Sequence, residues 1–375
     1  MKEKKKNKSA ALVCLLFSGF LLLNLLLFCL LPKSEFSEEE RRYLQSVPEF
    51  SLQAVLSGKF SQETEDYLAD HVPGRKFYIG LNALHDRLTL RQTLQEIYVG
   101  ESGRLYERPA AENEAVVTGN LTAIRTFAET VDQTVDLMLI PSAGAVLQED
   151  MGGLADPYPD FERIEEIYAR AGEKVRPVEL TKFYSDRADR EKFYYRTDPH
   201  LTSYGAYFTA AAYLKGKGLA CPEESQFTIE TVPGFYGSCY TRSALWNTPS
   251  EELELWHSGS EFRAEIDGMV SDSVFVTENL DSADMYTVYL DGNHSLVRLD
   301  NLSCRNGRSL LVIRDSFSNC MGSFLAEGYE KVVLVDLRYY KYPVSELCAQ
   351  EGFDDILIEY SLNNFLNSSN LNWLE

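Results

Sequence analysis

A serine directly after a short apolar run near the C-terminal end of the chain is placed where a hydroxyl can act as a nucleophile. Leu310 to Ile313 has the composition of a buried strand, and Arg314-Asp315-Ser316 follows at once. A serine at a strand-to-helix turn lies next to free backbone N–H groups, which can stabilise an oxyanion. The pattern also fits a simpler alternative, in which Asp315 or Ser316 only caps the next helix.

A serine nucleophile needs a base, and His200 is the histidine whose neighbours favour that role. Asp198 precedes it by two residues, and Pro199 between them favours an extended backbone at Asp198. In an extended segment residues i and i+2 point to the same side, so this carboxylate can orient the imidazole and stabilise its charged form. Ser316, His200 and Asp198 are therefore the candidate catalytic residues. The alternative is that Asp198 caps a helix beginning near Thr202.

The remaining histidines and the cysteines form no comparable group. His294, in Asp-Gly-Asn-His, fits a turn between two strands, and His85 falls within a helical pattern. His71 and His257 have no informatively placed acid beside them. The 7 cysteines are scattered without close pairs, so we expect neither a metal site nor a dense disulfide framework. The chemistry suggested by these residues needs no cofactor.

Short apolar runs alternate with helical stretches in the part of the chain that holds these residues. Such alternation predicts an α/β fold with a parallel sheet covered by helices on both faces. Ligands of such sheets bind beyond the carboxyl ends of the strands, which is where Ser316 falls. The predicted strands are 135–140, 193–195, 310–313, 332–335 and 356–358. The predicted helices are 116–131, 160–171, 202–216 with Thr202 as N-cap, 317–326 and 343–350.

A turn-rich region interrupts this alternation. Residues 220–300 contain short alternating segments at 286–290 and 296–299, which predict a β-rich antiparallel insertion. Ahead of the α/β region, the apolar runs 97–99 and 105–106 flank glycines and predict a hairpin.

The region before residue 93 has helical spacing. Residues 51–92 are broken at Pro73-Gly74, which predicts two packed helices. Ser37 followed by Glu40 is a capping-box pattern, and it predicts a short helix through Arg42. We therefore expect a helical juxtamembrane segment.

The N-terminus predicts one membrane span. Residues 11–31 carry no ionisable group and are preceded by Lys2, Lys4, Lys5, Lys6 and Lys8. As a helix this stretch is about 31 Å long, which matches a hydrocarbon core of about 30 Å, whereas a cleavable signal has a shorter apolar region. With the lysines in the cytoplasm, the remaining chain lies outside the cell membrane. A removed signal peptide is the alternative.

Composition excludes several classes of protein. The chain of 375 residues is 45% hydrophobic and 25% charged, as in globular proteins. Its formal net charge is −21 even though its first residues are basic, which argues against a nucleic-acid partner.

Several segments resemble the bacterial DHHW family, which takes its name from an Asp-His-His-Trp signature. That family is similar to the SGNH-hydrolase-like proteins AlgX and AlgJ, which O-acetylate a polysaccharide outside the cytoplasmic membrane with Ser, His and Asp. In the signature Pro199 replaces the first histidine and Leu201 the tryptophan, and Ser316 follows Arg-Asp where SGNH enzymes usually have Gly-Asp. The resembling segments are Phe36-Ser37 with Glu40-Arg41, Asp70 with Pro73-Gly74-Arg75, Tyr98-Val99-Gly100, Tyr194 to Thr202, Asp315-Ser316 and Asp336-Leu337-Arg338-Tyr339-Tyr340.

The resemblance implies roles and partners. Ser316 becomes the nucleophile, His200 the base and Asp198 the orienting acid, with Asp315, Arg338 and Tyr195 as weaker candidates for substrate contact. The implied reaction is O-acetylation of a cell-envelope or secreted polysaccharide, with a membrane-bound O-acyltransferase supplying the acyl group. With water as acceptor the same site is an esterase. The rival is a catalytically silent envelope scaffold or polysaccharide-binding protein, favoured by the substitutions around His200 and by the chain's acidity.

These expectations divide the chain into four parts. Residues 1–10 are a cytoplasmic basic tail, 11–31 the anchor, 32–92 the juxtamembrane segment, and 93–375 an SGNH-like α/β domain.

Overall fold

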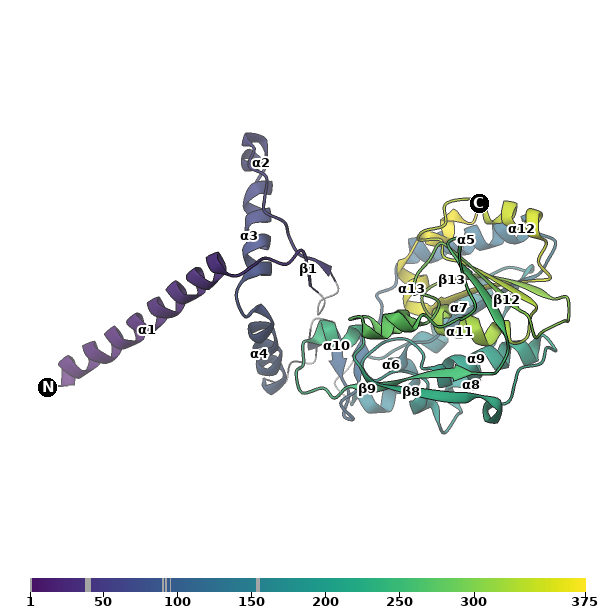
Figure 1. The fold of residues 1–375 in the computed structure, drawn as a ribbon, viewed down its shortest axis with the longest axis horizontal. Coiled ribbons are helices and arrows are strands. Elements are labelled where there is room, and N and C mark those ends of the chain that lie inside the picture. The colour runs from purple at the N-terminus through teal and green to yellow at the C-terminus, as the bar shows by residue number, and fades with distance from the viewer. Residues whose placement is uncertain (1, 38–41, 90, 92, 95, 153–155) are drawn as a thin grey trace. The chain divides into compact units, whose positions relative to one another are not determined.

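The chain forms two compact units in the computed structural model, which describes residues 2–37, 42–89, 91, 93–94, 96–152 and 156–375 (Figure 1). The first unit comprises Met1–Arg91 with Ala244–Trp246, and the second Gln92–Ser243 with Asn247–Glu375. The second unit holds the sheet and all of the candidate site residues.

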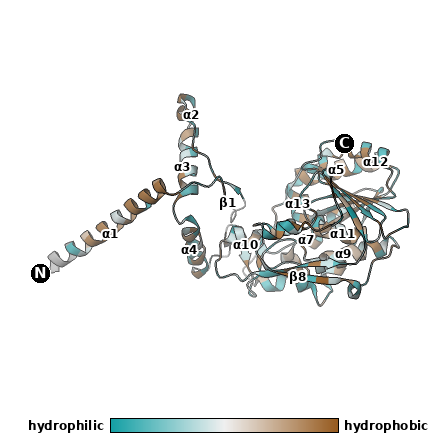
Figure 2. Cartoon of the chain, viewed as in Figure 1, coloured by the Kyte–Doolittle hydropathy of each residue, from teal (hydrophilic) through white to brown (hydrophobic). Residues whose placement is uncertain are grey.

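The first unit begins with a long apolar helix, α1 (Lys2–Leu30). Its segment Lys8–Leu30 is strongly apolar and is not buried by the rest of the chain. Figure 2 shows the strongly hydrophobic colouring along much of α1. By length and composition this helix can cross a membrane, and a signal sequence would have the same properties.

The expected short helix through Arg42 is wrong, because Ser37 and Arg42 lie on paired strands. Strands β1 (Phe36–Ser37) and β2 (Arg42–Tyr43) are antiparallel. The Arg42 Nη1 donates to Asp70 Oδ2 over 3.0 Å, and the Gln45 amide donates to the same oxygen over 2.8 Å. These long-range bonds fix an extended chain where local propensity favours a helix. Glu40, with the rest of 38–41, lies outside the described residues.

Helices complete the first unit. A short α2 (Leu52–Leu56) precedes α3 (Lys59–His71) and α4 (Arg75–Leu88). The predicted pair of helices broken at Pro73-Gly74 is confirmed, since α4 begins after Gly74, whose φ of 73° lies in the left-handed region that glycine tolerates.

The second unit is built on a mixed sheet of eight strands, and the predicted α/β fold is confirmed. The order is β11-β10-β12-β14-β13-β15-β6-β7, with parallel pairing from β14 through β7 and antiparallel pairing among the others. Strand β13 lies between β14 and β15 and pairs in parallel with both. The bounds are β6 Val135–Ile140, β7 Val175–Pro177, β10 Phe262–Ile266, β11 Met269–Ser271, β12 Leu296–Asn301, β13 Ser309–Arg314, β14 Lys331–Val335 and β15 Asp355–Ser361.

Helices cover both faces of this sheet (Figure 1). Successive side chains of a strand point to opposite faces, and here both faces carry apolar side chains that the helices bury. Leu310 and Val312 of β13 face one buried cluster, which includes side chains of α9 and α11. Leu311 and Ile313 face the other, which includes side chains of α5, α7, α12 and α13. The helices are α5 Glu114–Thr130, α6 Ala143–Val146, α7 Asp160–Arg170, α8 Thr181–Ser185, α9 Ser203–Gly216, α10 Ser238–Ser243, α11 Ser318–Ala326, α12 Val344–Glu351 and α13 Leu362–Asn367.

Smaller pieces surround the sheet. The predicted hairpin is confirmed as β4 (Ile97–Val99) and β5 (Leu105–Glu107). A short strand, β3 (Thr93–Leu94), pairs with the other edge of β4. A separate ribbon pairs β8 (Thr228–Phe235) with β9 (Glu251–His257). Short 3₁₀ turns occur at Gln148–Met151, Arg190–Lys192, Glu224–Gln226, Thr277–Asp281, Met285–Val288 and Asn370–Trp373.

Two predicted strands are wrong. At 193–195 the chain makes only an isolated bridge between Tyr194 and Leu201. The segment 286–290 begins as a 3₁₀ turn and then takes positive φ at Leu290, which ends any extended run. His294 therefore does not lie in a hairpin between two strands, although β12 begins two residues later.

Candidate active site

Ser316 lies at the carboxyl end of β13, in the turn that leads into α11. The side chain of the neighbouring Asp315 holds this turn by hydrogen bonds. Its Oδ1 accepts the Phe317 amide over 2.9 Å, while its Oδ2 accepts the Ser361 amide and the Asn364 side-chain amide, each over 2.8 Å. Asp315 thus ties the end of β13 to the end of β15, and the Ser316 side chain projects from a held backbone.

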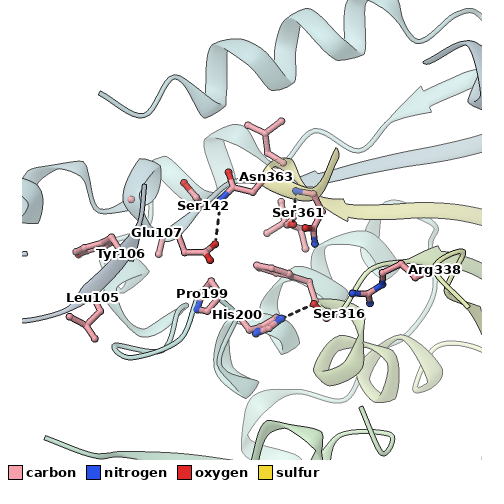
Figure 3. Close-up of a pocket in the computed structure, with 16 residues that line it drawn as sticks. Leu105, Tyr106, Glu107, Ser142, Pro199, His200, Ser316, Arg338, Ser361 and Asn363 are labelled. Carbon is pink, nitrogen blue, oxygen red and sulfur yellow. Dashed lines mark hydrogen bonds between the residues drawn. The ribbon is translucent and has the colours of Figure 1, made fainter. Parts of the chain in front are cut away.

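The three candidate catalytic residues form one hydrogen-bonded chain. Ser316 Oγ lies 2.8 Å from His200 Nε2, and His200 Nδ1 lies 2.5 Å from Asp198 Oδ1 (Figure 3 shows the first contact). Because an ionised carboxylate only accepts, Nδ1 carries the proton and Nε2 is left to accept from the serine hydroxyl. This is the arrangement that makes a serine hydroxyl a nucleophile.

Asp198 is itself held by groups from a distant loop. Its Oδ2 accepts the Ser238 amide over 2.8 Å and the Ser238 hydroxyl over 3.0 Å, and its side chain is 2% exposed. The close approach depends on Gly237, since a Cβ there would lie 2.1 Å from the Asp198 Cβ. A half-buried Glu251 accepts hydrogen bonds from the Arg196 and Thr197 backbone amides over 2.7 and 2.8 Å.

The electrostatics of this pair favour the ionised carboxylate. Burial disfavours the charged forms, but the charge of His200 and the hydrogen bonds to His200 and Ser238 outweigh it and lower the pKa of Asp198 to about 2. For His200, burial lowers the pKa, because it disfavours the charged imidazolium. The charge of Asp198 and its hydrogen bond outweigh this effect and raise the pKa of His200 above its ordinary value. The imidazolium formed during proton transfer is therefore stabilised.

Two aromatic rings hold the imidazole. Tyr286 stacks on it with a centroid distance of 4.3 Å and an interplanar angle of 16°. Phe317 contacts it at 4.8 Å and 49°. Tyr286 comes from the segment that fails to form the predicted strand, so its turn conformation serves to place this ring.

A cavity of about 200 Å³ opens at the Ser316 and His200 side chains (Figure 3). Its lining is of mixed polarity, with Pro199 and Phe317 beside polar groups from β5, α13 and the loop after β14. Glu107 accepts a hydrogen bond from the Asn363 side-chain amide over 3.5 Å and forms an ion pair with Arg242 over 2.5 Å. Such a polar, partly open cavity suits a small group together with hydroxyl-bearing ligands.

The weaker candidates for substrate contact separate by position. Arg338 lines the cavity, with its Nε bound to Asp336 Oδ1 over 2.9 Å. Asp315 is 2% exposed and Tyr195 1% exposed, and neither lines the cavity. The Tyr195 hydroxyl lies 3.2 Å from the Tyr289 hydroxyl, and the centroids of the Tyr195 and Tyr286 rings are 6.3 Å apart. Both therefore lie behind the residues that face the cavity.

Sequence reasoning missed the residues that hold the imidazole and the carboxylate. Ser238, Glu251 and Tyr286 come from separate segments, and nothing in their local spacing points to Asp198 or His200. It also left open the role of Arg314, which is fully buried, donates to Asn319 and faces Glu359 across the parallel strands.

Within the described part of the chain, no group of three His, Cys, Asp or Glu side chains is placed to hold a metal ion. His294 contacts Asp267 Oδ2 at 2.9 Å and Asp291 Oδ2 at 3.0 Å, away from the residues that line the cavity.

The fold defines an α/β protein with Ser316 at the carboxyl edge of a helix-covered and mostly parallel sheet. The family model described as DHHW protein matches residues 131–335, more than half of the chain. The chain belongs to the DHHW family.

Solved structures of a DHHW family protein and of PatB1 share this fold. A DHHW family protein from Eubacterium siraeum is 20% identical with a TM-score of 0.65, over 75% of this chain and 95% of that one. PatB1 of Bacillus cereus, solved with a sulfonyl adduct, is 18% identical with a TM-score of 0.61, over 74% and 98%. The O-acetyltransferase domain of Pseudomonas putida AlgJ is 14% identical with a TM-score of 0.46, over 72% and 92%. No curated protein matches the sequence.

Proposed function

We propose that the chain is a membrane-anchored, extracytoplasmic O-acyltransferase that acetylates a cell-envelope or secreted polysaccharide. The observation that carries this proposal is the hydrogen-bonded chain from Asp198 through His200 to Ser316 at the mouth of a cavity. The acetyl group and the polysaccharide come from the resemblance of the DHHW family to the SGNH-like O-acetyltransferases.

Acylation begins when His200 Nε2 takes the hydroxyl proton of Ser316 as Oγ attacks the carbonyl carbon of the donor. The tetrahedral intermediate collapses, the bond to the donor's leaving group breaks, and that group leaves with the proton from His200. The product is an acetyl ester on Ser316.

The second half of the reaction repeats these transfers with a sugar. A sugar hydroxyl gives its proton to His200 and attacks the ester carbonyl, and Ser316 leaves with the proton that His200 returns. The acetylated sugar departs and the site is restored without a cofactor.

Arg338 is the residue that we assign to the negative charge on the reacting carbonyl oxygen. Its guanidinium lines the cavity beside Ser316, and its Nε and Nη2 are held by Asp336 (Figure 3). A fixed cation beside a developing oxyanion stabilises the transition state more than the ground state. Asp315 and Tyr195 act behind the cavity, by holding the Ser316 turn and the Tyr286 ring.

The proposed arrangement in the cell follows from the N-terminal helix. Residues 1–10 stay in the cytoplasm, 11–31 span the membrane, 32–92 connect, and 93–375 form the catalytic domain outside. Because common activated acyl donors are cytoplasmic, a membrane-bound O-acyltransferase partner delivers the acetyl group.

Water in place of the sugar makes the same site an esterase, and the cavity is open enough to admit it. A sulfonyl adduct, as solved in the similar PatB1, forms when a nucleophilic atom attacks a sulfonyl reagent, which supports a nucleophile over the silent-scaffold alternative.

The test is acetyl transfer from a chromogenic acetyl ester to neutral and anionic envelope oligosaccharides, with acetylated product followed by mass spectrometry. Ser316→Ala and His200→Ala should each abolish ester turnover, and the double variant should be no worse than either, because the two residues act as one unit. His294→Ala is the control and should retain activity. Wild-type protein that turns over no acyl ester of any size supports the scaffold alternative.

A further inference from the structure

Helix α4 presents an apolar stripe that the rest of its unit leaves exposed. Phe77, Leu81, Leu84 and Leu88 follow the i, i+4, i+7, i+11 spacing of one helix face. Their exposed fractions are 56%, 47%, 38% and 74%. In a globular protein such a stripe normally faces the core, so its exposure points to a surface that it contacts elsewhere.

The face that α4 uses for packing in its own unit is a different one. Gly80, Ala83 and Asp86 are its buried residues. The Trp246 indole occupies the space beside Gly80, where a Cβ would lie 1.9 Å from two ring atoms. Trp246 also touches the stripe at Phe77, yet all four stripe residues remain at least 38% exposed.

The borders of the stripe have the chemistry of a membrane interface. Successive residues of a helix are rotated by roughly 100° about its axis. By this rotation the exposed Lys76 and Arg87 lie about 80–100° from the stripe on one side, and Tyr78 lies at a similar angle on the other side. Trp246 stacks on Phe77 at 5.4 Å and 26° and is 42% exposed. Tryptophan and tyrosine are enriched at the boundary between acyl chains and water, and basic residues at anionic headgroups.

The rest of the molecule argues for lipid as the occupant. The chain has a net charge of −21, yet α4 carries Arg75, Lys76 and Arg87 against Asp86, and Arg75 forms an ion pair with Asp70 of α3, over 3.8 Å. This local excess of positive charge complements an anionic lipid surface. The unit that contains α4 also contains α1, whose apolar segment can cross a membrane and ends at Leu30.

We infer that α4 lies in the membrane–water interface, with the stripe among the acyl chains and Lys76 and Arg87 at anionic headgroups. This second contact fixes the orientation of the unit on the membrane, which a single spanning helix leaves free to rotate. The inference rests on the anchoring half of the proposed function and not on its acyl chemistry, so an inactive Ser316 would leave it standing.

The test uses the full chain reconstituted into vesicles of phosphatidylcholine and phosphatidylglycerol whose acyl chains are brominated. Bromine quenches only tryptophan that lies among the acyl chains. Subtracting the spectrum of Trp246→Phe from that of the parent isolates Trp246 from the other tryptophans. We expect its emission to be blue-shifted and quenched, and more strongly with phosphatidylglycerol than with phosphatidylcholine alone.

Matched variants on α4 separate insertion from anchoring and from misfolding. Leu84→Glu should abolish the quenching, because a carboxylate cannot enter the acyl region beside anionic headgroups. Asn82→Glu adds the same charge on an exposed position away from the stripe and should leave the quenching unchanged. Circular dichroism of both variants reports whether the helices are retained. Unquenched Trp246 in the parent, or equal quenching with and without phosphatidylglycerol, overturns the inference.

Discussion

At the scale of single residues, the site depends on one carboxylate that stays ionised inside the protein. Asp198 keeps a pKa of about 2 because the charge and hydrogen bond of His200 and the amide of Ser238 outweigh burial. The same interaction raises the pKa of His200, and a base must be neutral to accept the serine proton. Activity should therefore be lost as pH falls through that raised pKa.

The pH profile of ester turnover tests this coupling. Wild-type activity should rise with pH through a midpoint above 6.5, the ordinary pKa of histidine, because His200 is neutral only above its raised pKa. Asp198→Asn removes the charge that raises it, so the midpoint should move to lower pH while kcat falls by about 10²–10⁴-fold. An Asp198→Asn midpoint equal to the wild-type one would contradict the coupling.

Tyr286 gives a second prediction at this scale. Tyr286→Leu removes the ring stacked on His200 and should lower kcat by about tenfold or more, since a small misplacement of a catalytic group is costly. Tyr286→Phe is the matched control and should stay near wild type, because the hydroxyl makes only a 3.4 Å contact with the Ser316 carbonyl. Both are measured as kcat and KM, and equal activity of the two variants would show that the stack does not matter.

Local spacing was enough to predict which residues meet, and distance along the chain explains what it missed. Asp198 and His200 are two residues apart around a proline, and Ser316 follows an apolar strand, so short-range rules apply to each. Tertiary structure alone brings three further residues to the site: Ser238 of α10, Glu251 of β9 and Tyr286 of a 3₁₀ turn. No local sequence pattern encodes these contacts.

At the scale of elements, the loop between β8 and α10 supports the site. Gly237 lets this loop approach Asp198, and a Cβ at that position would lie 2.6 Å from both Asp198 Oδ2 and the Thr197 carbonyl. Neither the carboxylate nor this backbone can move without losing hydrogen bonds.

Gly237→Ala should therefore lower the free energy of unfolding by about 1–3 kcal/mol and impair ester turnover. Gly216→Ala is the control, because a Cβ at the end of α9 meets no atom within 4 Å and alanine favours a helix. Denaturant unfolding and ester turnover measure both effects, and a fully active, equally stable Gly237→Ala protein would refute the role of this approach.

The elements that the sequence predicts well are those buried on both faces. Strands β6, β13, β14 and β15 are almost entirely buried and each contains a short apolar run, which is the signal that predicts them. The expected helix through Arg42 and the expected strand 286–290 are wrong because tertiary contacts decide these segments: Asp70 binds Arg42, and Tyr286 stacks on His200.

At the scale of the whole molecule, we propose that the unit that contains Ser316 lies outside the membrane. If α1 is an uncleaved anchor, the protein should stay in the membrane fraction after carbonate extraction, and its intact mass should include the N-terminal lysines. Protease added outside intact spheroplasts should digest the chain after residue 35. A mature chain that starts after residue 31 would indicate a cleaved signal, and protection from the protease would reverse the topology.

Activation of Ser316 as a nucleophile by His200 is tested by the mass of the protein after reaction with a sulfonyl fluoride, followed by peptide mapping. We expect one sulfonyl adduct on the peptide that contains Ser316, no adduct on Ser316→Ala, and adduct formation at least about 10²-fold slower on His200→Ala. An intact mass that does not change, or an adduct that remains in Ser316→Ala, would contradict it.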